Sequence, residues 1–270
     1  MKRLVGLYRE KQYSPGRHQS NDALLLDHIA HRLREREFAV DLMTLEEANG
    51  ARSEAALVFS MCQGRAALDD LAQWEREGVR IMNSPQAALN THRDRLPALM
   101  VEARLPFPQT NLVITEQSPD LHGLNLDEGI WLKRGDVHAS VTADVQWIDS
   151  RERLETGLAD FAQRGINLAA LQAHRAGDEI KFYGVGGGAF FHWFYSRNAR
   201  KHPFDSARLQ ELGNQAAAAA GLDVFGGDVI VSPTGELTLI DLNDWPSFAP
   251  CRERAAYAIA DFITKRVHAG

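Results

Sequence analysis

Short apolar runs alternate with longer segments of mixed apolar and polar residues over residues 1–82. Apolar runs of about four to eight residues are typical of strands, and apolar residues repeated at three- and four-residue spacing are typical of an amphipathic helix. Strands are therefore predicted at residues 3–8, 39–43, 56–60 and 79–82, with helices at 22–37 and 66–77. Regular alternation of strands and helices predicts a wound α/β sheet.

The second part of the chain begins near Asn83-Ser84-Pro85 and has a less regular pattern. A helix is predicted at residues 85–102 and ends before Pro106 and Pro108, because proline cannot continue a helix. After these prolines, a strand is predicted to begin at residue 109, and further strands are predicted at 130–133, 168–174 and 180–185. The apolar half of 190–202 predicts a buried strand. Helices are predicted at 151–164, 207–221 and 252–267. A region of α+β type is therefore expected after the first domain.

Residues 13–22 follow the first predicted strand, where open parallel sheets place ligand-binding loops. Arg17 and His18 are candidates to meet an anionic substrate in this loop. An ordinary surface loop that ends in a helix cap at Asn21 or Asp22 is the alternative interpretation.

A β-hairpin is predicted at residues 227–246, where two β-branched, apolar runs flank Ser-Pro-Thr-Gly. Symmetric pairing about a turn near Thr234 and Gly235 gives the facing pairs Ile230–Leu239, Val229–Ile240 and Asp228–Asp241. Like charges in facing positions repel, and Asn243 shares the face of Asp241 because side chains two residues apart in a strand do so. Two carboxylates and an amide oxygen suit Mg²⁺, which completes its shell with water and nucleotide phosphates. A solvated hairpin end with both acids in water is the alternative.

Composition narrows the classes of function. The chain has 270 residues and a formal net charge of -6, which argues against a nucleic-acid partner. Cys62 and Cys251 are its two cysteines, too few for a disulfide framework or a cysteine zinc site. The sequence contains no apolar span approaching the ~20 residues of a membrane helix. The apolar run near its start is too short for the hydrophobic region of a signal peptide. We therefore expect no membrane partner and a cytoplasmic location.

Several short motifs follow one another along the chain. They are Asn83-Ser84-Pro85, Arg93-Asp94-Arg95, Leu105-Pro106-Phe107-Pro108-Gln109-Thr110, Trp131-Leu132-Lys133, Leu171-Gln172-Ala173-His174, Gly227-Asp228 and Asp241-Leu242-Asn243. In this order they resemble the ATP-grasp superfamily over about residues 84–270. The likeness is to RimK-like and glutathione-synthetase-like ligases, with a second likeness, in 181–185 and 240–248, to inositol-tetrakisphosphate kinases. It implies an N-terminal α/β domain at 1–84 and a two-subdomain ATP-grasp fold divided into 85–170 and 171–270.

The resemblance also implies ligands and site residues. It implies that ATP and Mg²⁺, or Mn²⁺ in its place, bind between the two subdomains. It assigns Lys133 and Arg95 to the phosphates, Gln172, Ala173 and His174 to an adenine hinge, Asp178 or Glu179 to the ribose, and Asp228, Asp241 and Asn243 to the metal. Without it, Lys133 would be interpreted as a strand-end lysine that reaches solvent, and residues 172–174 as an edge strand.

Two departures from the family pattern bear on the reaction. The flap at 134–140 has a single glycine where several are usual, and it contains His138, a candidate contact for a transferred phosphate or substrate oxygen. A solvent-facing loop histidine is the alternative. Asp241 stands where glutamate is usual, which matches the kinase-like pattern better. Arg197, Arg200, Lys201 or His202 is the candidate to meet the γ-phosphate or acyl phosphate, and the sequence does not choose among them.

The resemblance favours a carboxylate–amine ligase that acts through an acyl phosphate on a small molecule or short peptide. A small-molecule kinase is the alternative; its hydroxyl nucleophile benefits from a general base, for which only His138 or Asp136 is a candidate. A nucleotide-binding regulatory module is a second alternative, which the presence of the complete phosphate and metal set argues against. Neither the substrate nor the oligomeric state can be predicted from spacing.

Overall fold

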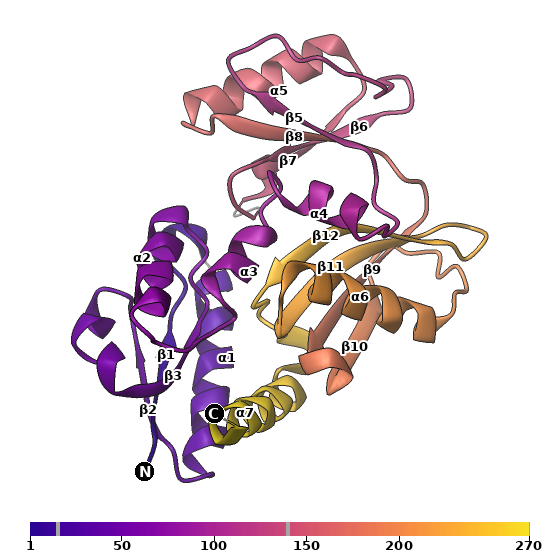
Figure 1. The fold of residues 1–270 in the computed structure, drawn as a ribbon. Helices are drawn as coiled ribbons and strands as arrows, with labels where there is room; N and C mark the ends of the chain where they lie inside the picture. The colour runs from indigo at the N-terminus through magenta and orange to yellow at the C-terminus, as the bar shows by residue number, and fades with distance from the viewer. Residues whose placement is uncertain (15–16, 139–140, 270) are drawn as a thin grey trace.

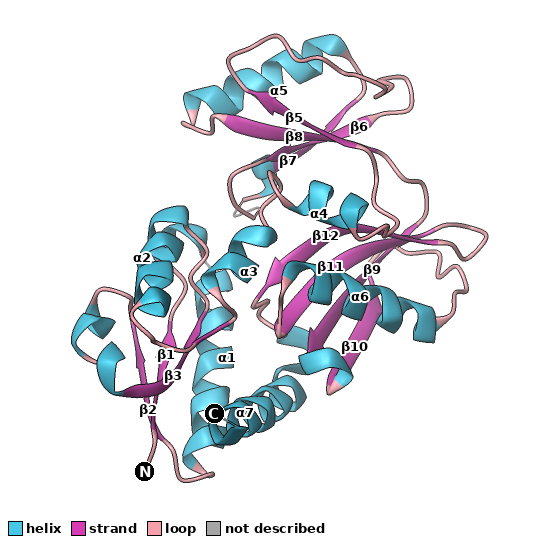
Figure 2. Cartoon of the chain, in the orientation of Figure 1, coloured by secondary structure: helices cyan, strands magenta, loops and turns pink. Residues whose placement is uncertain are grey.

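The computed structural model describes residues 1–14, 17–138 and 141–269, which form three four-stranded sheets with helices packed against them (Figure 1). Figure 2 shows the sheets as separate layers, with the sheet of residues 110–173 above that of residues 178–244 and the N-terminal sheet to one side. The predicted mixed α/β architecture is confirmed. No helix among these residues is long and apolar enough to cross a membrane.

The N-terminal sheet is parallel, in the order β2-β1-β3-β4. Its strands are β1 (Arg3–Leu7), β2 (Ala39–Met43), β3 (Ala55–Ser60) and β4 (Ile81–Met82), with helices α1 (Arg17–Arg34) and α2 (Arg65–Arg76). Helix α1 begins at Arg17, so the expected loop at 13–22 is shorter than predicted and Arg17 and His18 belong to the helix. The side chains of these two residues lie outside the described part of the structure.

The single helix predicted at residues 85–102 is wrong. The chain forms two short helices, α3 (Pro85–Asn90) and α4 (Leu96–Glu102), separated by residues 91–95. Pro97 explains the break, because it has no N–H to continue a helix from α3 but is tolerated in the first turn of α4. The interruption turns residues 91–95 into a linker between the N-terminal domain and the rest of the molecule.

The upper sheet has the order β5-β8-β6-β7 and is antiparallel. Its elements are β5 (Thr110–Ile114), β6 (Ile130–Arg134), β7 (Val145–Ile148), β8 (Leu168–Ala173) and α5 (Arg151–Gln163). Leu132, Leu158 and Phe161 share one core between the sheet and α5. Strand β7 has no counterpart in the sequence prediction, and β8 spans the expected division at residue 170.

The lower sheet, in the order β10-β9-β11-β12, is also antiparallel. Its elements are β9 (Asp178–Val185), β10 (Phe190–Tyr195), β11 (Val224–Val231), β12 (Leu237–Asp244) and α6 (Ser206–Ala220). Strand β10 lies at the edge of the sheet and its residues are half-buried, so the expectation of a buried strand is corrected to an edge strand.

The C-terminal helix α7 (Arg252–Ala269) returns to the N-terminal domain and packs on α1 (Figure 1). Ile259 and Ile263 of α7 are fully buried in one core with Leu26, Ile29 and Leu33 of α1. Short 3₁₀ helices occur at Lys11–Tyr13, Glu47–Gly50, Arg52–Glu54, Thr142–Asp144, Gly186–Gly188 and Ala249–Cys251. The two ends of the chain therefore build the same domain and hold it beside the lower sheet.

Candidate active site

Asp228 and Asp241 face each other across strands β11 and β12, as the hairpin pattern predicts. The register is not symmetric, because β12 has an irregularity at Ile240 and Val229 faces Leu239 instead. Leu239 and Leu242 both reach the core beneath α6 as a result. Asp241 is therefore directed to the other face of the sheet, toward the upper sheet, and strand alternation places Asn243 on that face too.

Each of the two carboxylates is paired with a cation that the sequence prediction did not include. Lys181 of β9 places its Nζ 2.9 Å from Asp228 Oδ1 and 2.8 Å from Glu179 Oε1. Arg93 of the 91–95 linker places Nη2 2.6 Å from Asp241 Oδ2. Burial opposes ionisation of Asp241, but Arg93 and Lys133 outweigh it and lower its pKa to about 2. Burial raises the pKa of Asp228, and Lys181 acts against that shift. The facing acids are thus balanced by cations from separate elements.

Lys133, at the end of strand β6, is buried and does not reach solvent, which corrects the alternative interpretation. Its Nζ donates to Gln172 Oε1 at 2.7 Å and to the carbonyl of Ile240 at 3.4 Å. Burial lowers the pKa of Lys133 to about 8, against the effect of Asp241. The lysine therefore reaches from the upper sheet to the β11–β12 hairpin of the lower sheet.

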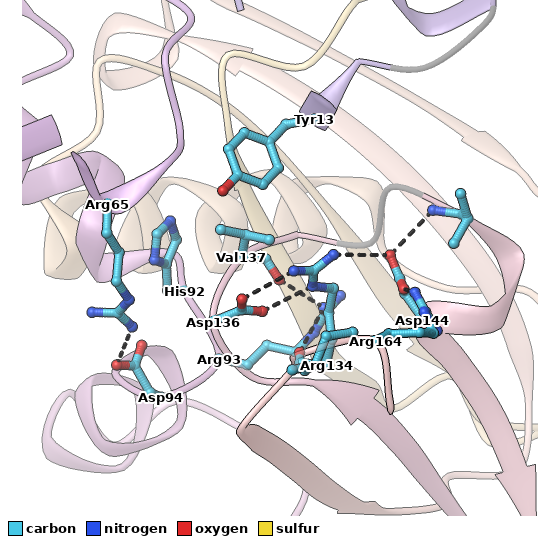
Figure 3. Close-up of polar contacts among 12 residues, drawn as sticks. Tyr13, Arg65, His92, Arg93, Asp94, Arg134, Asp136, Val137, Asp144 and Arg164 are labelled. Atoms are coloured by element: carbon cyan, nitrogen blue, oxygen red, sulfur yellow. Dashed lines mark hydrogen bonds and ion pairs between the residues drawn. The ribbon is translucent and has the colours of Figure 1, made fainter. Parts of the chain in front are cut away.

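Arg93, and not Arg95, lies against the carboxylates. Arg93 is 6% exposed, and its Nη1 donates to the carbonyls of Arg134 and Val137 in the flap (Figure 3). Arg95 is half-buried at the start of α4 and has no ion pair within the described residues. Pro97 is the sequence signal that could have identified Arg93. A proline at this position indicates that a new helix begins near residue 96, so that residues 91–95 form a linker.

Residues 172–174 differ from the expected edge strand. Strand β8 lies between β5 and β6, so Gln172 and Ala173 have neighbours on both sides. Gln172 contributes its side chain to Lys133, and the Ala173 N–H donates to the carbonyl of Gln109. His174 lies beyond the strand, where Trp131 Nε1 donates to its Nδ1 at 3.3 Å.

Asp178 accepts hydrogen bonds from the backbone N–H groups of Arg200 at 2.7 Å and His202 at 2.6 Å. Its carboxylate therefore holds the loop between β10 and α6, and the ribose contact expected for Asp178 stays a prediction. Arg197 and Lys201 are exposed on this loop, and neither forms an ion pair within the described ranges.

His138 is buried in the flap, so the solvent-facing alternative is wrong. Its Nε2 lies 2.8 Å from Thr91 Oγ1, and its ring lies edge-on to that of His92 with centroids 6.0 Å apart. Burial lowers the pKa of His138 to about 3, against the effect of Asp241, so the ring is neutral near pH 7. The flap and the linker meet at this residue, and Asp241 of the β11–β12 hairpin is near enough to affect its pKa.

Two polar clusters join the N-terminal domain to the hairpin. Arg9 donates to Asp22 at 2.9 Å, to Gln63 at 2.6 Å and to the carbonyl of Trp245 at 2.7 Å. Asn83 donates to the carbonyl of Val224 and to Asp244, and its own oxygen accepts from the N–H groups of Asp223 and Val224. Both clusters fix the position of the strands that carry Asp228 and Asp241.

The donor set fits Mg²⁺. Within residues 1–14, 17–138 and 141–269 no group of three or more His, Cys, Asp and Glu side chains could hold a metal, which excludes a site made from those ligands alone. Asp228 and Asp241 face each other, and Asn243 on the same strand face offers an amide oxygen; oxygen ligands of this kind, few in number, are those that Mg²⁺ takes from proteins.

No protein-family model and no curated protein sequence matches the chain. Solved structures do match over almost their whole length. A D-alanine–D-alanine ligase from Bacillus anthracis complexed with ATP has a TM-score of 0.78 and 10% identity, covering 99% of this chain and 97% of that one. An ATP-grasp RimK domain protein from Sphaerobacter thermophilus has a TM-score of 0.72 and 15% identity, covering 97% and 99%.

The VanG D-Ala:D-Ser ligase from Enterococcus faecalis has a TM-score of 0.73 and 13% identity, covering 98% of this chain and 99% of that one. At these identities the similarity concerns the arrangement of elements and not the identity of substrates. The three sheets, their order along the chain and the full-length matches together show that the chain has the ATP-grasp fold.

Proposed function

We propose that the protein is an ATP-dependent carboxylate–amine ligase that works with MgATP between the upper and lower sheets. One observation carries the proposal: Arg93 of the linker pairs with Asp241, Lys181 of the lower sheet pairs with Asp228, and Lys133 of the upper sheet donates to the carbonyl of Ile240 beside Asp241. Three buried or half-buried cations around two facing acids form a site suited to polyphosphate and a divalent cation. The ATP-bound ligase of the same fold supports this assignment.

In this proposal Lys133 and Arg93 bind the phosphates of ATP. Arg93 has the planar donor geometry that can bind two phosphate oxygens, and it replaces Arg95 in this role. The adenine ring of ATP would lie toward the His174 end of β8, where the ring centroids of Trp147 and His174 are 4.9 Å apart. Ring faces at that end are suitable stacking partners for adenine.

Asp228, Asp241 and Asn243 would hold the magnesium ion, which when bound neutralises phosphate charge. In the structure Asp241 is paired with Arg93, and Asp228 is paired with Lys181. With a metal ion held by the carboxylates, Arg93 and Lys181 would be free to bind phosphate oxygens. The same side chains thus stabilise the acids before nucleotide binding and the transferred phosphate after it.

The reaction follows from this placement. A substrate carboxylate oxygen attacks the γ-phosphorus, the bond to the ADP oxygen breaks, and an acyl phosphate forms. The amine nitrogen then attacks the acyl carbon, phosphate leaves, and the amine loses a proton as the amide bond forms. Lys133, Arg93 and Lys181 would neutralise the charge that spreads over the phosphoryl oxygens in the first step. The exposed loop of Arg197 and Lys201 would approach the same group only on closing.

The kinase remains the second candidate, on one observation. Asp241 provides a short carboxylate arm of the kinase-like kind, and His138 lies within electrostatic reach of it. A hydroxyl nucleophile benefits from a general base with a pKa near the working pH, whereas the pKa of His138 is lowered to about 3. A carboxylate nucleophile needs no such base, and this favours the ligase.

Measurement of ADP release tests the reaction type. The full chain with MgATP is assayed against pooled carboxylic acids, amino acids and short peptides, each with and without an amine pool, and against pooled polyols. A ligase releases ADP only when a carboxylate and an amine are both present. Release with polyols alone would replace the ligase with the kinase, and binding of MgATP without release in any pool would favour the regulatory module.

A further inference from the structure

Four buried polar atoms around the 91–95 linker have no hydrogen-bond partner among the residues that the structure describes. They are Nδ1 of His92, Nε of Arg93, Oδ1 of Asp94 and Nδ1 of His138. His92 is 0% exposed and His138 is 8% exposed, so water does not reach them freely. Leaving buried polar atoms unpaired costs about 1–3 kcal/mol each, which makes such a cluster a candidate ligand site.

The hydrogen bonds fix which nitrogen of each ring carries the proton. His92 Nε2 lies 3.0 Å from the carbonyl of Gln63, which can only accept, so Nε2 is the donor. The Thr91 hydroxyl donates to the carbonyl of Ala88 at 2.7 Å, so it accepts from His138 Nε2. In a neutral ring the other nitrogen is then bare. Both Nδ1 atoms therefore present a free lone pair.

Protonation does not remove these lone pairs near pH 7. Burial and the charge of Arg65 lower the pKa of His92 to about 4, against the effect of Asp94. Burial lowers that of His138 to about 3. With Asp94 Oδ1, the site offers three acceptors against the single free donor of Arg93. Its occupant must donate hydrogen bonds.

The neighbouring cations do not give the site a net positive charge. Arg65 pairs with Asp94 at 2.5 Å, and Arg93 pairs with Asp241 at 2.6 Å. Arg9, whose charge acts on His138, pairs with Asp22 at 2.9 Å. Figure 3 shows Arg65, His92 and Asp94 on one side and the flap residues on the other. Asp136 of the flap, whose charge also acts on His92, is paired with Arg134 at 2.8 Å.

We propose that His92 Nδ1, His138 Nδ1 and Asp94 Oδ1 bind the amine substrate, which rests on the proposed ligase function. The site has the required position, because Arg93 connects the linker to Asp241 and the flap, where the acyl phosphate would form. A neutral primary amine has two N–H donors, one for each histidine nitrogen, and its protonated form has a third for Asp94 Oδ1. The histidines accept hydrogen bonds and hold the nitrogen, and neither has to take up a proton.

The test is ¹⁵N NMR of the full chain with labelled histidine, using glycinamide as the amine probe. Acetate and ethylene glycol are the matched carboxylate and hydroxyl probes, and each titration is run with and without MgADP. We expect two neutral rings with bare Nδ1 atoms, and a shift of both Nδ1 resonances toward the hydrogen-bonded position with glycinamide alone. Protonated Nδ1 atoms, no shift with glycinamide, or an equal shift with ethylene glycol would overturn the amine site.

Substitution of His138 is a second test of the amine site. His138→Phe should weaken glycinamide binding about tenfold, the effect of one lost buried hydrogen bond, and His122→Asn on an exposed loop is the control. MgADP affinity is measured in parallel by calorimetry. No glycinamide response by the wild type, or unchanged glycinamide binding by His138→Phe, with intact MgADP binding defeats this inference alone. Absent MgADP binding by the wild type defeats the proposed function. If His138→Phe does not fold, the wild-type titration decides.

Discussion

At the residue scale, the site depends on side chains that neutralise one another across long stretches of sequence. The hairpin pattern placed Asp228 opposite Asp241 correctly, because a hairpin is local. Lys133 was assigned to the site by the family resemblance alone, since its pattern indicated a lysine that reaches solvent. Arg93 and Lys181 were not predicted. The contact of Arg93 with Asp241 spans 148 positions, and no local rule relates residues so far apart.

Replacing Arg93 with glutamine should weaken MgATP binding by about ten- to hundredfold, because a charge-assisted hydrogen bond is lost. Arg95→Gln is the matched control two residues away and should change the affinity little. Calorimetric titration of both variants with MgATP checks this. A larger loss in Arg95→Gln than in Arg93→Gln would return the phosphate role to Arg95.

His92 should make stability depend on pH. The pKa of His92 is lowered from 6.5 to about 4, so the unfolded chain binds a proton that the folded chain refuses. The stabilising contribution is therefore present above about pH 6.5 and is lost as the pH falls toward 4. Melting temperatures measured across this range should fall less steeply in His92→Gln, which keeps a donor for Gln63. Parallel curves for both proteins would contradict the assignment.

At the element scale, strands and helices with clear periodicity were predicted and segments set by packing were not. Strand β12 shows the limit: its acids were placed correctly although the Ile240 irregularity shifts the pairs nearer the turn. The break between α3 and α4 was not predicted, although Pro97 is tolerated in the first turn of a helix and cannot continue one. Strand β8 was expected at an edge, and its two neighbours come from distant parts of the chain.

The loop between β10 and α6 should depend on Asp178. Asp178→Ala removes the acceptor for two backbone N–H groups, and we expect a loss of about 1–3 kcal/mol in the free energy of unfolding. Urea denaturation measures it, with Asp160→Ala on the exposed side of α5 as control. Equal midpoints for the two variants would mean that the loop is not held by this carboxylate.

At the scale of the whole molecule, the N-terminal domain and the lower sheet are joined by helix α7 and by buried polar clamps. Neither feature can be read from local sequence, since Asn83 lies at the end of one domain and its partners lie 140 and 141 positions away. Asn83→Ala leaves the Asp223 and Val224 N–H groups unpaired, and should lower the free energy of unfolding by about 3 kcal/mol. Denaturation of this variant against exposed Asn198→Ala checks the clamp, and an unchanged midpoint would contradict it.

The central claim is that MgATP binds at the facing carboxylates between the upper and lower sheets. Calorimetric titration of the full chain with MgATP, beside the Asp228→Asn/Asp241→Asn variant, tests it most directly, with circular dichroism to confirm that both proteins are folded. We predict metal-dependent binding by the wild type and its loss in the variant, because the amides cannot replace the charges that hold the metal. Equal binding by both proteins, or none by the wild type, would contradict the claim.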